Sequence, residues 1–408
     1  MSSDVVIVGA SVGGVRAAQS LRADGFTGSI KVIDAEDHMP YDKPPLSKGF
    51  LSGSQGVDRI SLISEKAIAE ANIEFLLGTA ATKLDVAESR IVLGDKGTLH
   101  FDQLVIATGV RARPSPWEAT DGVHLLRSLD DALSLRADFE SANSVVIVGA
   151  GFIGAEVAAT ARHFGLTTSL VDPLPIPMAR VMGDEVGIRF IELHHRNQVQ
   201  TYFGMGVESI TGSKGNLKVE LSDGTLLSSD VVVVGIGAVP NDAWLDSSGL
   251  LIDNGVVCDE YCRVVGHSNI YAIGDVARWH HPRHGKLVRV EHWTNAVEQA
   301  ACVSHNITNP DELHQYAPVE YVWSDQYDWK IQLAGITAEA DGQVILEDPN
   351  NPNRFAAIYN DSAGKYCGVV TVNWPRALIE CRKLLSGDYE ISVPVQRVEA
   401  LLAASPSR

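Results

Sequence analysis

The feature that most constrains this chain is one stretch, SVVIVGAGFIGAEVAATARHFGLTTSLVD, at residues 144–172. A β-branched run enters a glycine turn, and a helix-compatible segment and a second apolar run follow, which predicts a strand–helix–strand unit. The glycines permit a tight turn, close approach of a pyrophosphate and close helix packing; they are Gly149, Gly151 and Gly154. Asp172 ends the second run, where an acid binds a ribose 2′-hydroxyl and repels a 2′-phosphate. Because no cation follows before Arg180, the pattern predicts NAD rather than NADP.

A weaker copy of this pattern, DVVIVGASVGG, lies near the N-terminus. Gly9 and Gly14 fill the first and third glycine positions, and Ser11 replaces the second. The next predicted strand ends in IDAED, where either Asp34 or Glu36 can take ribose hydroxyls. Two such units predict two bound dinucleotides, and a flavin with a nicotinamide makes a hydride relay that two nicotinamides would not.

Three further predicted strands run into glycine turns and support the flavin. They are LVIATGVRARP (104–114), DVVVVGIGAVPN (230–241) and NIYAIGDVARW (269–279). The last contains Gly274 and Asp275, whose carboxylate can bind a ribityl hydroxyl, and a following helix N-terminus is expected to face the phosphates. In the C-terminal part, short strands between Gly, Asp and Asn turns predict a small antiparallel sheet and then a helix.

The composition limits the kinds of partner that the protein can bind. The 408 residues predict two or three domains, and the net charge of −18 argues against nucleic acid or an anionic membrane as partner of the whole molecule. No apolar run reaches the roughly 18 residues of a membrane span. The N-terminus lacks the basic region of a secretory signal. A cytoplasmic protein without a metal site is expected.

Cysteine positions exclude two kinds of thiol enzyme. The cysteines are Cys258, Cys262, Cys302, Cys367 and Cys381, so the first 257 residues contain none. A disulfide reductase needs a thiol pair beside the flavin in the first domain, and a thiol-based NADH peroxidase or oxidase needs one thiol there. The close pair in CDEYC lacks nearby ligands, so we expect reduced thiols there rather than a metal or redox site.

Several longer motifs resemble one family. PYDKPPLSK, GFIGAEVAATAR, YAIGDVARW, VEHWTNAVEQA and WSDQ are similar to segments of the FAD-dependent ferredoxin reductases of bacterial oxygenase systems. This group includes putidaredoxin reductase and biphenyl dioxygenase ferredoxin reductase, and it belongs to the glutathione-reductase-like flavoproteins. The resemblance covers nearly the whole chain.

The resemblance implies an α/β fold with two Rossmann-like domains, one for FAD and one for NAD, and a small C-terminal α+β domain. The FAD-binding domain would comprise residues 1–111 and 238–312. The NAD-binding domain would be inserted between them at 112–237, and the C-terminal domain would be 313–408.

The resemblance also implies a purpose for PYDKPPLSKGF. The Pro-Pro pair would start a helix over the flavin, with Lys48 near N5 and O4 of the isoalloxazine and Glu156 as its partner. A cation there stabilises the anion that develops on the flavin as hydride arrives, but its charge is costly in a closed site unless it is paired. Lys48 and Glu156 are therefore the predicted catalytic residues.

Pattern and resemblance together predict two sets of cofactor contacts. The FAD set is Gly9, Ser11, Gly13, Gly14, Asp34, Glu36, Lys43, Lys48, Ala81, Arg127, Gly274, Asp275, Trp293 and Trp323. The NAD set is Gly149, Gly151, Ile153, Gly154, Glu156, Asp172, Arg180 and Gly237.

The function implied by the resemblance is electron transfer from NADH through FAD to a [2Fe–2S] ferredoxin. The ferredoxin would serve a ring-hydroxylating dioxygenase or a cytochrome P450. The alternative is a non-catalytic redox sensor or scaffold of the apoptosis-inducing-factor type. Since such ferredoxins are acidic, docking would need a local basic face. The candidates are RWHHPRHGKLVR, which begins at Arg278, and PRALIECRKLL, which contains Arg376, Arg382 and Lys383.

Overall fold

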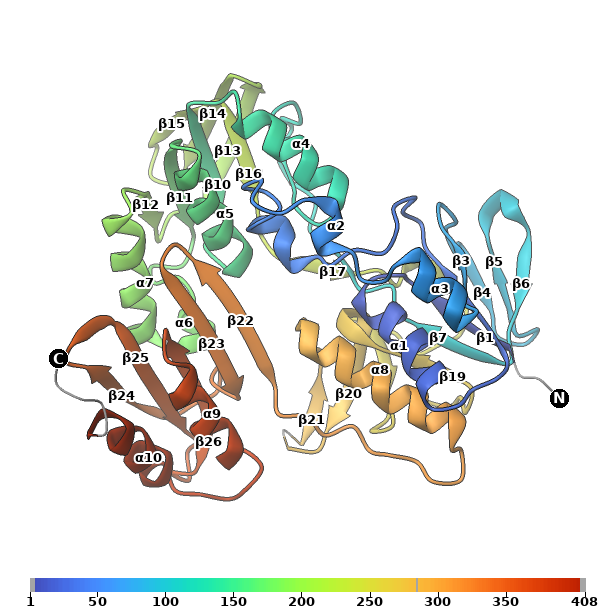
Figure 1. Ribbon diagram of the computed structural model, residues 1–408. Helices are drawn as coiled ribbons and strands as arrows, with labels where there is room; N and C mark the ends of the chain where they lie inside the picture. The colour runs from blue at the N-terminus through green and yellow to red at the C-terminus, as the bar shows by residue number, and fades with distance from the viewer. Residues whose placement is uncertain (1–3, 284, 404–408) are drawn as a thin grey trace. The chain divides into compact units, whose positions relative to one another are not determined.

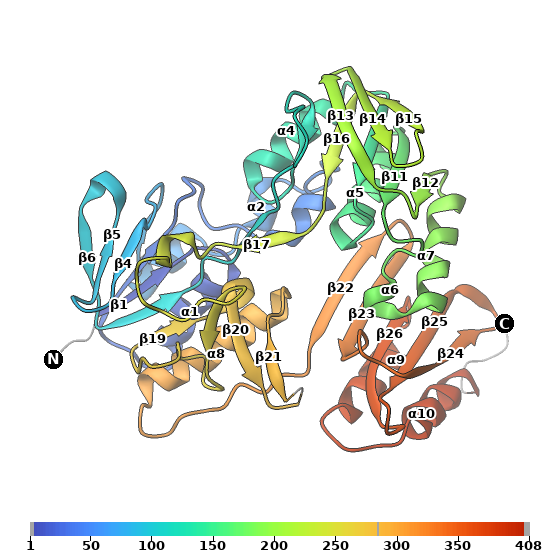
Figure 2. The same cartoon turned by 180° about the vertical axis from the view of Figure 1, so that it is seen from behind.

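The computed structural model describes residues 4–283 and 285–403, and their contacts divide them into two compact units. The first unit comprises the described residues up to Pro44, together with Gly56–Arg111 and Ala238–Pro318. The second comprises Pro45–Gln55, Ala112–Gly237 and the described residues from Val319 onward. Figures 1 and 2 draw the chain from opposite sides. The division into four domain segments that the sequence suggests stays a prediction.

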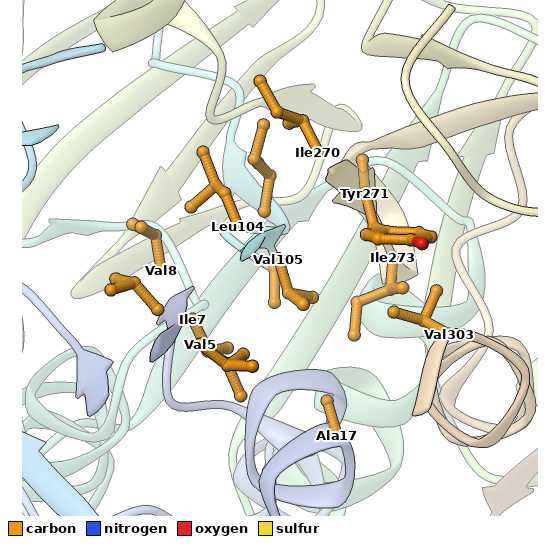
Figure 3. Close-up of a cluster of buried hydrophobic side chains, with 14 of the residues drawn as sticks. Val5, Ile7, Val8, Ala17, Leu104, Val105, Ile270, Tyr271, Ile273 and Val303 are labelled. Carbon is orange, nitrogen blue, oxygen red and sulfur yellow. The ribbon is translucent and has the colours of Figure 1, made fainter. Parts of the chain in front are cut away.

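A five-stranded parallel sheet forms the centre of the first unit, in the order β19-β7-β1-β2-β3. Its strands are β1 (Asp4–Val8), β2 (Ser29–Ile33), β3 (Glu74–Leu76), β7 (Gln103–Ile106) and β19 (Ile270–Ala272). Helices α1 (Val12–Ala23) and α8 (Trp293–Thr308) lie side by side over it. In Figure 3, side chains of β1, β7 and β19 share a core with Ala17 of α1 and Val303 of α8. The continuous apolar strand sequences follow from burial on both faces of the sheet.

Smaller elements complete the first unit. One antiparallel sheet consists of β4 (Lys83–Asp85), β5 (Arg90–Val92) and β6 (Thr98–His100). Another three-stranded sheet consists of β18 (Val256–Cys258), β20 (Ala277–His281) and β21 (Lys286–Val288). The short helices are α2 (Val57–Ile60) and α3 (Glu65–Ala71), and β8 (Val110–Ala112) pairs with β17 (Ala238–Pro240).

The second unit contains another parallel sheet, in the order β12-β11-β10-β16-β9. Its strands are β9 (Val123–His124), β10 (Ser144–Val148), β11 (Thr167–Asp172), β12 (Gln200–Phe203) and β16 (Val231–Val234). Two helices, α4 (Leu129–Phe139) and α5 (Phe152–His163), bury apolar residues with it. An antiparallel sheet of β13 (Val207–Ser213), β14 (Asn216–Leu221) and β15 (Leu226–Ser229) accompanies it. Each unit thus has a parallel sheet whose first βαβ turn carries the glycine pattern.

The C-terminal part of the second unit is an antiparallel sheet in the order β22-β23-β26-β25-β24, as the sequence predicts. Its strands are β22 (Tyr321–Gln326), β23 (Trp329–Gly335), β24 (Gly342–Asp348), β25 (Asn351–Asn360) and β26 (Tyr366–Val372). Residues of α6 (Ala179–Met182) and α7 (Asp184–Arg196) pack into one apolar cluster with this sheet. A second cluster contains residues of α9 (Pro375–Leu384) and α10 (Ser392–Ala403). The predicted sheet and helix α9 are confirmed.

One local expectation is confirmed in a shorter form, because the predicted helix is a 3-10 helix, and another is wrong. The Pro-Pro pair starts only a 3-10 turn, Pro44–Ser47, and successive turns lead to Gly53, whose φ is +77. Glycines at 49 and 53 explain why no longer helix forms. After Asp275 a 3-10 turn leads directly into β20, so the next long helix is α8, which begins only at Trp293.

Within residues 4–283 and 285–403, no helix has the length and apolar character to cross a bilayer.

We expect His194 to make the stability of the second unit depend on pH. Its side chain is 1% exposed on α7, and its Nδ1 lies 3.0 Å from the hydroxyl of Tyr327. Burial lowers the pKa of His194 from 6.5 to about 4, so the unfolded chain binds the proton first. The stabilising contribution is complete above about pH 6.5 and is lost as the pH falls toward 4. Between pH 7 and pH 5 the loss from this residue should be about 2 kcal/mol.

Urea unfolding of wild type and two variants at both pH values measures this loss. His194→Gln should remove most of the pH-dependent difference in unfolding free energy. His195→Gln changes the exposed neighbour and should keep it. The same pH dependence in both variants would contradict the assignment to His194.

Candidate functional site

The turn between β1 and α1 requires glycine at two positions. Gly9 has a φ of +111, and a Cβ there would overlap the carbonyl oxygen of Ala107. A Cβ on Gly14 would overlap the carbonyl oxygen of Gly9, so the helix lies directly on the turn. Ser11 is the N-cap of α1 with a φ of −79, which any residue adopts, and its side chain caps no backbone N–H. The serine therefore leaves the turn intact, and the start of α1 can receive an anion.

The turn between β10 and α5 has the same geometry in the second unit. Gly149 has a φ of +103, and a Cβ there would overlap the carbonyl oxygen of Gly235. Gly154 packs on the carbonyl of Gly149 in the same way. A Cβ on Gly151 would meet nothing within 4 Å, so the backbone is open to a pyrophosphate there.

An aspartate at the end of the second strand holds each turn. Asp34 accepts a hydrogen bond from the backbone N–H of Ala10, the residue after the first glycine. Asp172 accepts the equivalent bond from Ala150 at 2.8 Å. Burial raises the pKa of Asp34, and the backbone N–H groups that bond its carboxylate oppose this effect. The two aspartates therefore occupy equivalent positions in the two units.

Glu36, the other candidate for the FAD ribose, is engaged elsewhere. Its Oε1 lies 3.0 Å from Lys43 Nζ, and its Oε2 accepts a hydrogen bond from the hydroxyl of Tyr41. The ammonium of Lys43 also lies 4.7 Å from the centre of the Tyr41 ring. The structure thus brings together two predicted FAD contacts, Glu36 and Lys43, as an ion pair. Its match with Asp172 favours Asp34 as the ribose ligand, and this role stays a prediction.

A buried amide holds the turn that carries Gly274 and Asp275. Gly274 has a φ of +71, and its N–H donates to Gln299 Oε1 at 2.7 Å. Gln299 is fully buried, and among the described residues its Nε2 has no hydrogen-bond partner. A buried donor left without an acceptor costs about 1–3 kcal/mol. This free donor beside the turn, with the open start of α1, fits a cofactor rich in phosphate and hydroxyl groups, such as FAD.

Sequence reasoning missed Gln299, although it lies in the singled-out motif VEHWTNAVEQA. Asn295 Nδ2 donates to Gln299 Oε1 at 3.3 Å, and the hydroxyl of Tyr316 donates to Asn295 Oδ1 at 2.9 Å. The usable signal was the four-residue spacing of two amides on the inward face of a helix. At the start of the same helix, Trp293 Nε1 donates to Asp42 Oδ1 at 2.8 Å. The chain of amides therefore fixes the Gly274 turn to the helix that begins at Trp293.

Lys48 and Glu156 form an ion pair inside the second unit. Lys48 Nζ lies 2.8 Å from Glu156 Oε1, and the two side chains are 18% and 3% exposed. Glu156 lies on the buried face of α5, and Lys48 follows directly after the 3-10 turn. Removing either partner would leave a buried charge uncompensated, which costs about 3–5 kcal/mol.

Two serines that the sequence prediction missed complete the surroundings of Glu156. Ser47 Oγ donates to its Oε2 at 2.5 Å, and Ser324 Oγ donates to its Oε1 at 2.6 Å. The hydroxyl of Thr160 donates to the backbone carbonyl of Ser47 at 2.8 Å, which ties the loop to α5. Both serines lie in motifs that the sequence singled out, PPLSK and WSDQ. The loop that carries Ser47 and Lys48 and the strand β22 therefore meet at one carboxylate of α5.

The remaining predicted residues lie apart from this cluster or have other contacts. In the first unit, Ala81 is half-buried against the core, and Gly13 faces Ile273. In the second unit, Arg127 donates its backbone N–H to Asp131 at 2.9 Å. These contacts do not test whether the residues bind a cofactor, so their cofactor roles stay predictions.

Trp323 and three NAD-site candidates also belong to the second unit. The ring of Trp323 stacks against that of Tyr321, with centroids 6.1 Å apart. Ile153 is 45% exposed at the start of α5, Arg180 is exposed on α6, and Gly237 has a φ of +106. Their predicted contacts with the cofactors also stay predictions.

Ion pairs with acids outside the first predicted basic stretch reduce its positive charge. Arg278 forms an ion pair with Asp253, and Arg289 Nη1 lies 2.6 Å from Glu291. Both acids lie outside the stretch, which is why its sequence seemed free of negative charge. Residue 284 of the stretch lies outside the described residues. The docking face therefore stays a prediction.

The cysteine pair in CDEYC is fully buried, and all five cysteines are free thiols. Among the described residues, no group of three or more His, Cys, Asp and Glu side chains could hold a metal ion.

Comparison with known families defines the class of protein. The family model described as pyridine nucleotide-disulphide oxidoreductase matches residues 3–300, and the model described as reductase C-terminal matches residues 321–397. The chain therefore belongs to the pyridine nucleotide-disulphide oxidoreductase family and carries a reductase C-terminal domain. The predicted fold class is confirmed, and the cofactors of this class are FAD and NAD(H).

Individual relatives place the chain more narrowly. Rhodocoxin reductase of Rhodococcus erythropolis is 36% identical, with 95% of this chain and 90% of the relative covered. The anthranilate 1,2-dioxygenase system ferredoxin–NAD(+) reductase component of Burkholderia cepacia is 34% identical, with 95% of each covered. The reductase in a covalent putidaredoxin reductase–putidaredoxin complex is 30% identical, with 99% of each chain covered and a TM-score of 0.91. The expected resemblance to ferredoxin reductases of oxygenase systems is confirmed.

We expect Asp34, rather than Glu36, to determine FAD affinity. Asp34→Ala removes a charged hydrogen-bond acceptor, worth about 1.5–3 kcal/mol, and should raise the Kd for FAD about 10- to 100-fold. Glu36→Ala should change it by less than about threefold, because its carboxylate is already paired with Lys43. FAD rebinding to apoprotein, followed by flavin fluorescence, measures both.

Asp172→Ala is the matched control, because it removes the equivalent acid from the other turn. It should leave FAD affinity unchanged. A larger loss of FAD affinity in Glu36→Ala than in Asp34→Ala would reverse the assignment.

Proposed function

We propose that this protein is an NADH-dependent ferredoxin reductase, which passes electrons from NADH through FAD to a [2Fe–2S] ferredoxin. The ferredoxin then serves an oxygenase, either a ring-hydroxylating dioxygenase or a cytochrome P450. The relatives support this, since their names include a ferredoxin–NAD(+) reductase component of a dioxygenase system and a reductase in complex with putidaredoxin.

The observation that carries the proposal is the repetition of one turn geometry. Gly9 with Asp34 and Gly149 with Asp172 form two equivalent dinucleotide turns, one in each unit. Two dinucleotides suit hydride transfer between a nicotinamide and a flavin. With no cysteine in the first 257 residues, electrons cannot continue to a thiol pair in that part of the chain, so an external acceptor is required.

A bound flavin would supply hydride acceptance and the release of electrons one at a time. The residues of this chain supply orientation and charge. Lys48 presents an ammonium beside Glu156, which the hydroxyls of Ser47 and Ser324 also bind. A fixed positive charge in a partly buried site stabilises negative charge that develops on a bound group. Since the serines fix the carboxylate, and the carboxylate fixes the ammonium, this charge needs little reorganisation.

A cytoplasmic location is part of the proposal. It is supported by the proposed use of NADH and by five cysteines that are all free thiols.

The decisive experiment is reduction of cytochrome c by NADH with the purified holoenzyme and a panel of [2Fe–2S] ferredoxins. At least one ferredoxin should raise the rate well above that of reductase alone. Ferricyanide, a small acceptor, serves as control for the NADH-to-flavin half of the reaction. Rapid ferricyanide reduction with no response to any ferredoxin would contradict the ferredoxin step, and no NADH oxidation at all would support the non-catalytic alternative.

We expect a preference of about 100-fold for NADH over NADPH in kcat/KM, because a carboxylate facing a 2′-phosphate costs several kcal/mol. Asp172 is the residue in question. Steady-state kinetics with both nucleotides measure the preference. Asp172→Ala should narrow it, and equal efficiencies in wild type would refute the assignment.

We expect Lys48→Ala to slow flavin reduction by NADH about 10²- to 10³-fold while FAD stays bound, because it removes the charge near the reacting group. Ser324→Ala removes one hydrogen bond to Glu156 but leaves the charge of Lys48 in place, so it should slow flavin reduction only about 2- to 10-fold. Stopped-flow absorbance measures both rates.

The double variant Lys48→Ala with Glu156→Ala should be less than additive, as expected for two residues in one interaction. Strict additivity would show that the pair does not act together.

A further inference from the structure

Two cysteine side chains that no part of the proposed electron path uses lie against each other in the first unit. Cys262 follows β18 in a turn and is fully buried, whereas Cys302 lies on α8 and is partly exposed. Asn306 Nδ2 donates to Cys302 Sγ at 3.5 Å and to the carbonyl oxygen of Tyr261 at 3.2 Å, so the sulfur of Cys302 lies beside the turn of Cys262, and both cysteines belong to one packed cluster. The cysteine nearest to Cys262 in sequence is Cys258, whereas Cys302 belongs to a helix that is distant in sequence.

The turn that presents Cys262 is fixed by a neighbouring carboxylate. Asp259 Oδ1 accepts hydrogen bonds from the backbone N–H groups of Tyr261, at 2.9 Å, and Arg263, at 3.0 Å. The Arg263 guanidinium pairs with Asp259 Oδ2 at 2.8 Å. Within this turn Cys262 has a φ of +61, a left-handed conformation that is unfavourable for a residue with a Cβ. Such strain persists only where the surroundings determine it, and here the turn packs into the cluster that Cys302 of α8 also contacts.

The two sulfurs differ in the way that a reactive and a resolving thiol differ. The neighbouring thiol of Cys262 lowers the pKa of Cys302, and the side-chain amide of Asn306 donates to the same sulfur at 3.5 Å. Burial raises the pKa of Cys262, so it stays protonated while Cys302 is the better nucleophile. Oxidation-sensitive cysteines are typically exposed, of low pKa and adjacent to a second thiol.

We propose that Cys302 and Cys262 form a peroxide-sensitive dithiol that closes reversibly to a disulfide. The thiolate of Cys302 attacks a hydroperoxide: an S–O bond forms, the O–O bond breaks, and hydroxide leaves. Cys262 then attacks the sulfenic sulfur: the S–S bond forms, the S–O bond breaks, and water leaves with the proton of Cys262. In sum, two thiols and one hydrogen peroxide give one disulfide and two waters. A dithiol reductant reverses the reaction by thiol–disulfide exchange.

This site is distinct from the nucleotide turns and does not depend on the proposed electron transfer. Cys302 is nine residues after Trp293 (302 − 293), which places it about 13 Å along α8 from the start of the helix. The disulfide would tie α8 to the turn around Cys262, a cross-link between segments 40 residues apart (302 − 262). We expect such a cross-link to raise the thermal midpoint of the oxidised protein.

Peptide mapping of the full-length holoprotein under non-reducing conditions, after treatment with hydrogen peroxide, tests the proposal. The expected product is an intramolecular Cys262–Cys302 peptide pair, lighter by two hydrogen atoms and restored by dithiothreitol. Cys302→Ser should abolish it. Cys262→Ser should leave a sulfenic acid at Cys302 that a dimedone probe traps. Cys367→Ser, which changes another partly exposed thiol, is the matched control and should form the disulfide normally.

Three results would overturn the proposal. One is a disulfide that joins Cys302 to Cys258 instead. Another is a Cys302 thiol that survives excess peroxide unmodified. The third is oxidation of Cys367 at the same peroxide concentration and rate as Cys302. All three results are measured in the wild-type protein, so the test remains valid even if a serine variant fails to fold.

Discussion

The second unit depends on one buried carboxylate. Glu156 is 3% exposed on α5, and it would be costly there without compensation. Lys48 supplies the opposite charge, and the hydroxyls of Ser47 and Ser324 supply hydrogen bonds. Because these donors come from the loop at 45–55 and from β22, whereas Glu156 lies on α5, the acid joins three parts of the chain that are remote in sequence. These contacts stabilise the buried carboxylate of Glu156, and the carboxylate in turn orients the ammonium of Lys48.

The repeated turn explains why so much of the fold follows from local sequence. Gly9 and Gly149 adopt positive φ, and an aspartate at the end of the next strand accepts the N–H group that follows each of them. All these features are local: a β-branched run, glycines at fixed spacing and an acid about 25 residues later. The antiparallel C-terminal sheet was predictable for a similar reason, because turn residues separate its short strands.

Contacts between residues far apart in sequence were not predictable in this way. Ser324 lies 168 residues from Glu156, and nothing in WSDQ shows where its hydroxyl points. Asp253 neutralises Arg278 from outside the basic stretch, so counting acids within the stretch overestimated its charge. The roles of Ser324 and Asp253 depend on tertiary packing, whereas periodicity and motifs describe only residues that are close in sequence.

Helix α8 shows how one element can combine these local and distant constraints. Its first residue, Trp293, is anchored to Asp42, and a turn and a half later Gln299 holds the N–H of Gly274. Cys302 follows one turn beyond, beside the turn that carries Cys262. A helix whose successive turns are bonded to different segments cannot shift along its axis without breaking several buried contacts. A disulfide at Cys302 would therefore add a constraint to a helix that is already fixed near the Gly274 turn. We expect oxidation to change the stability of the first unit more than it changes the position of the cofactor.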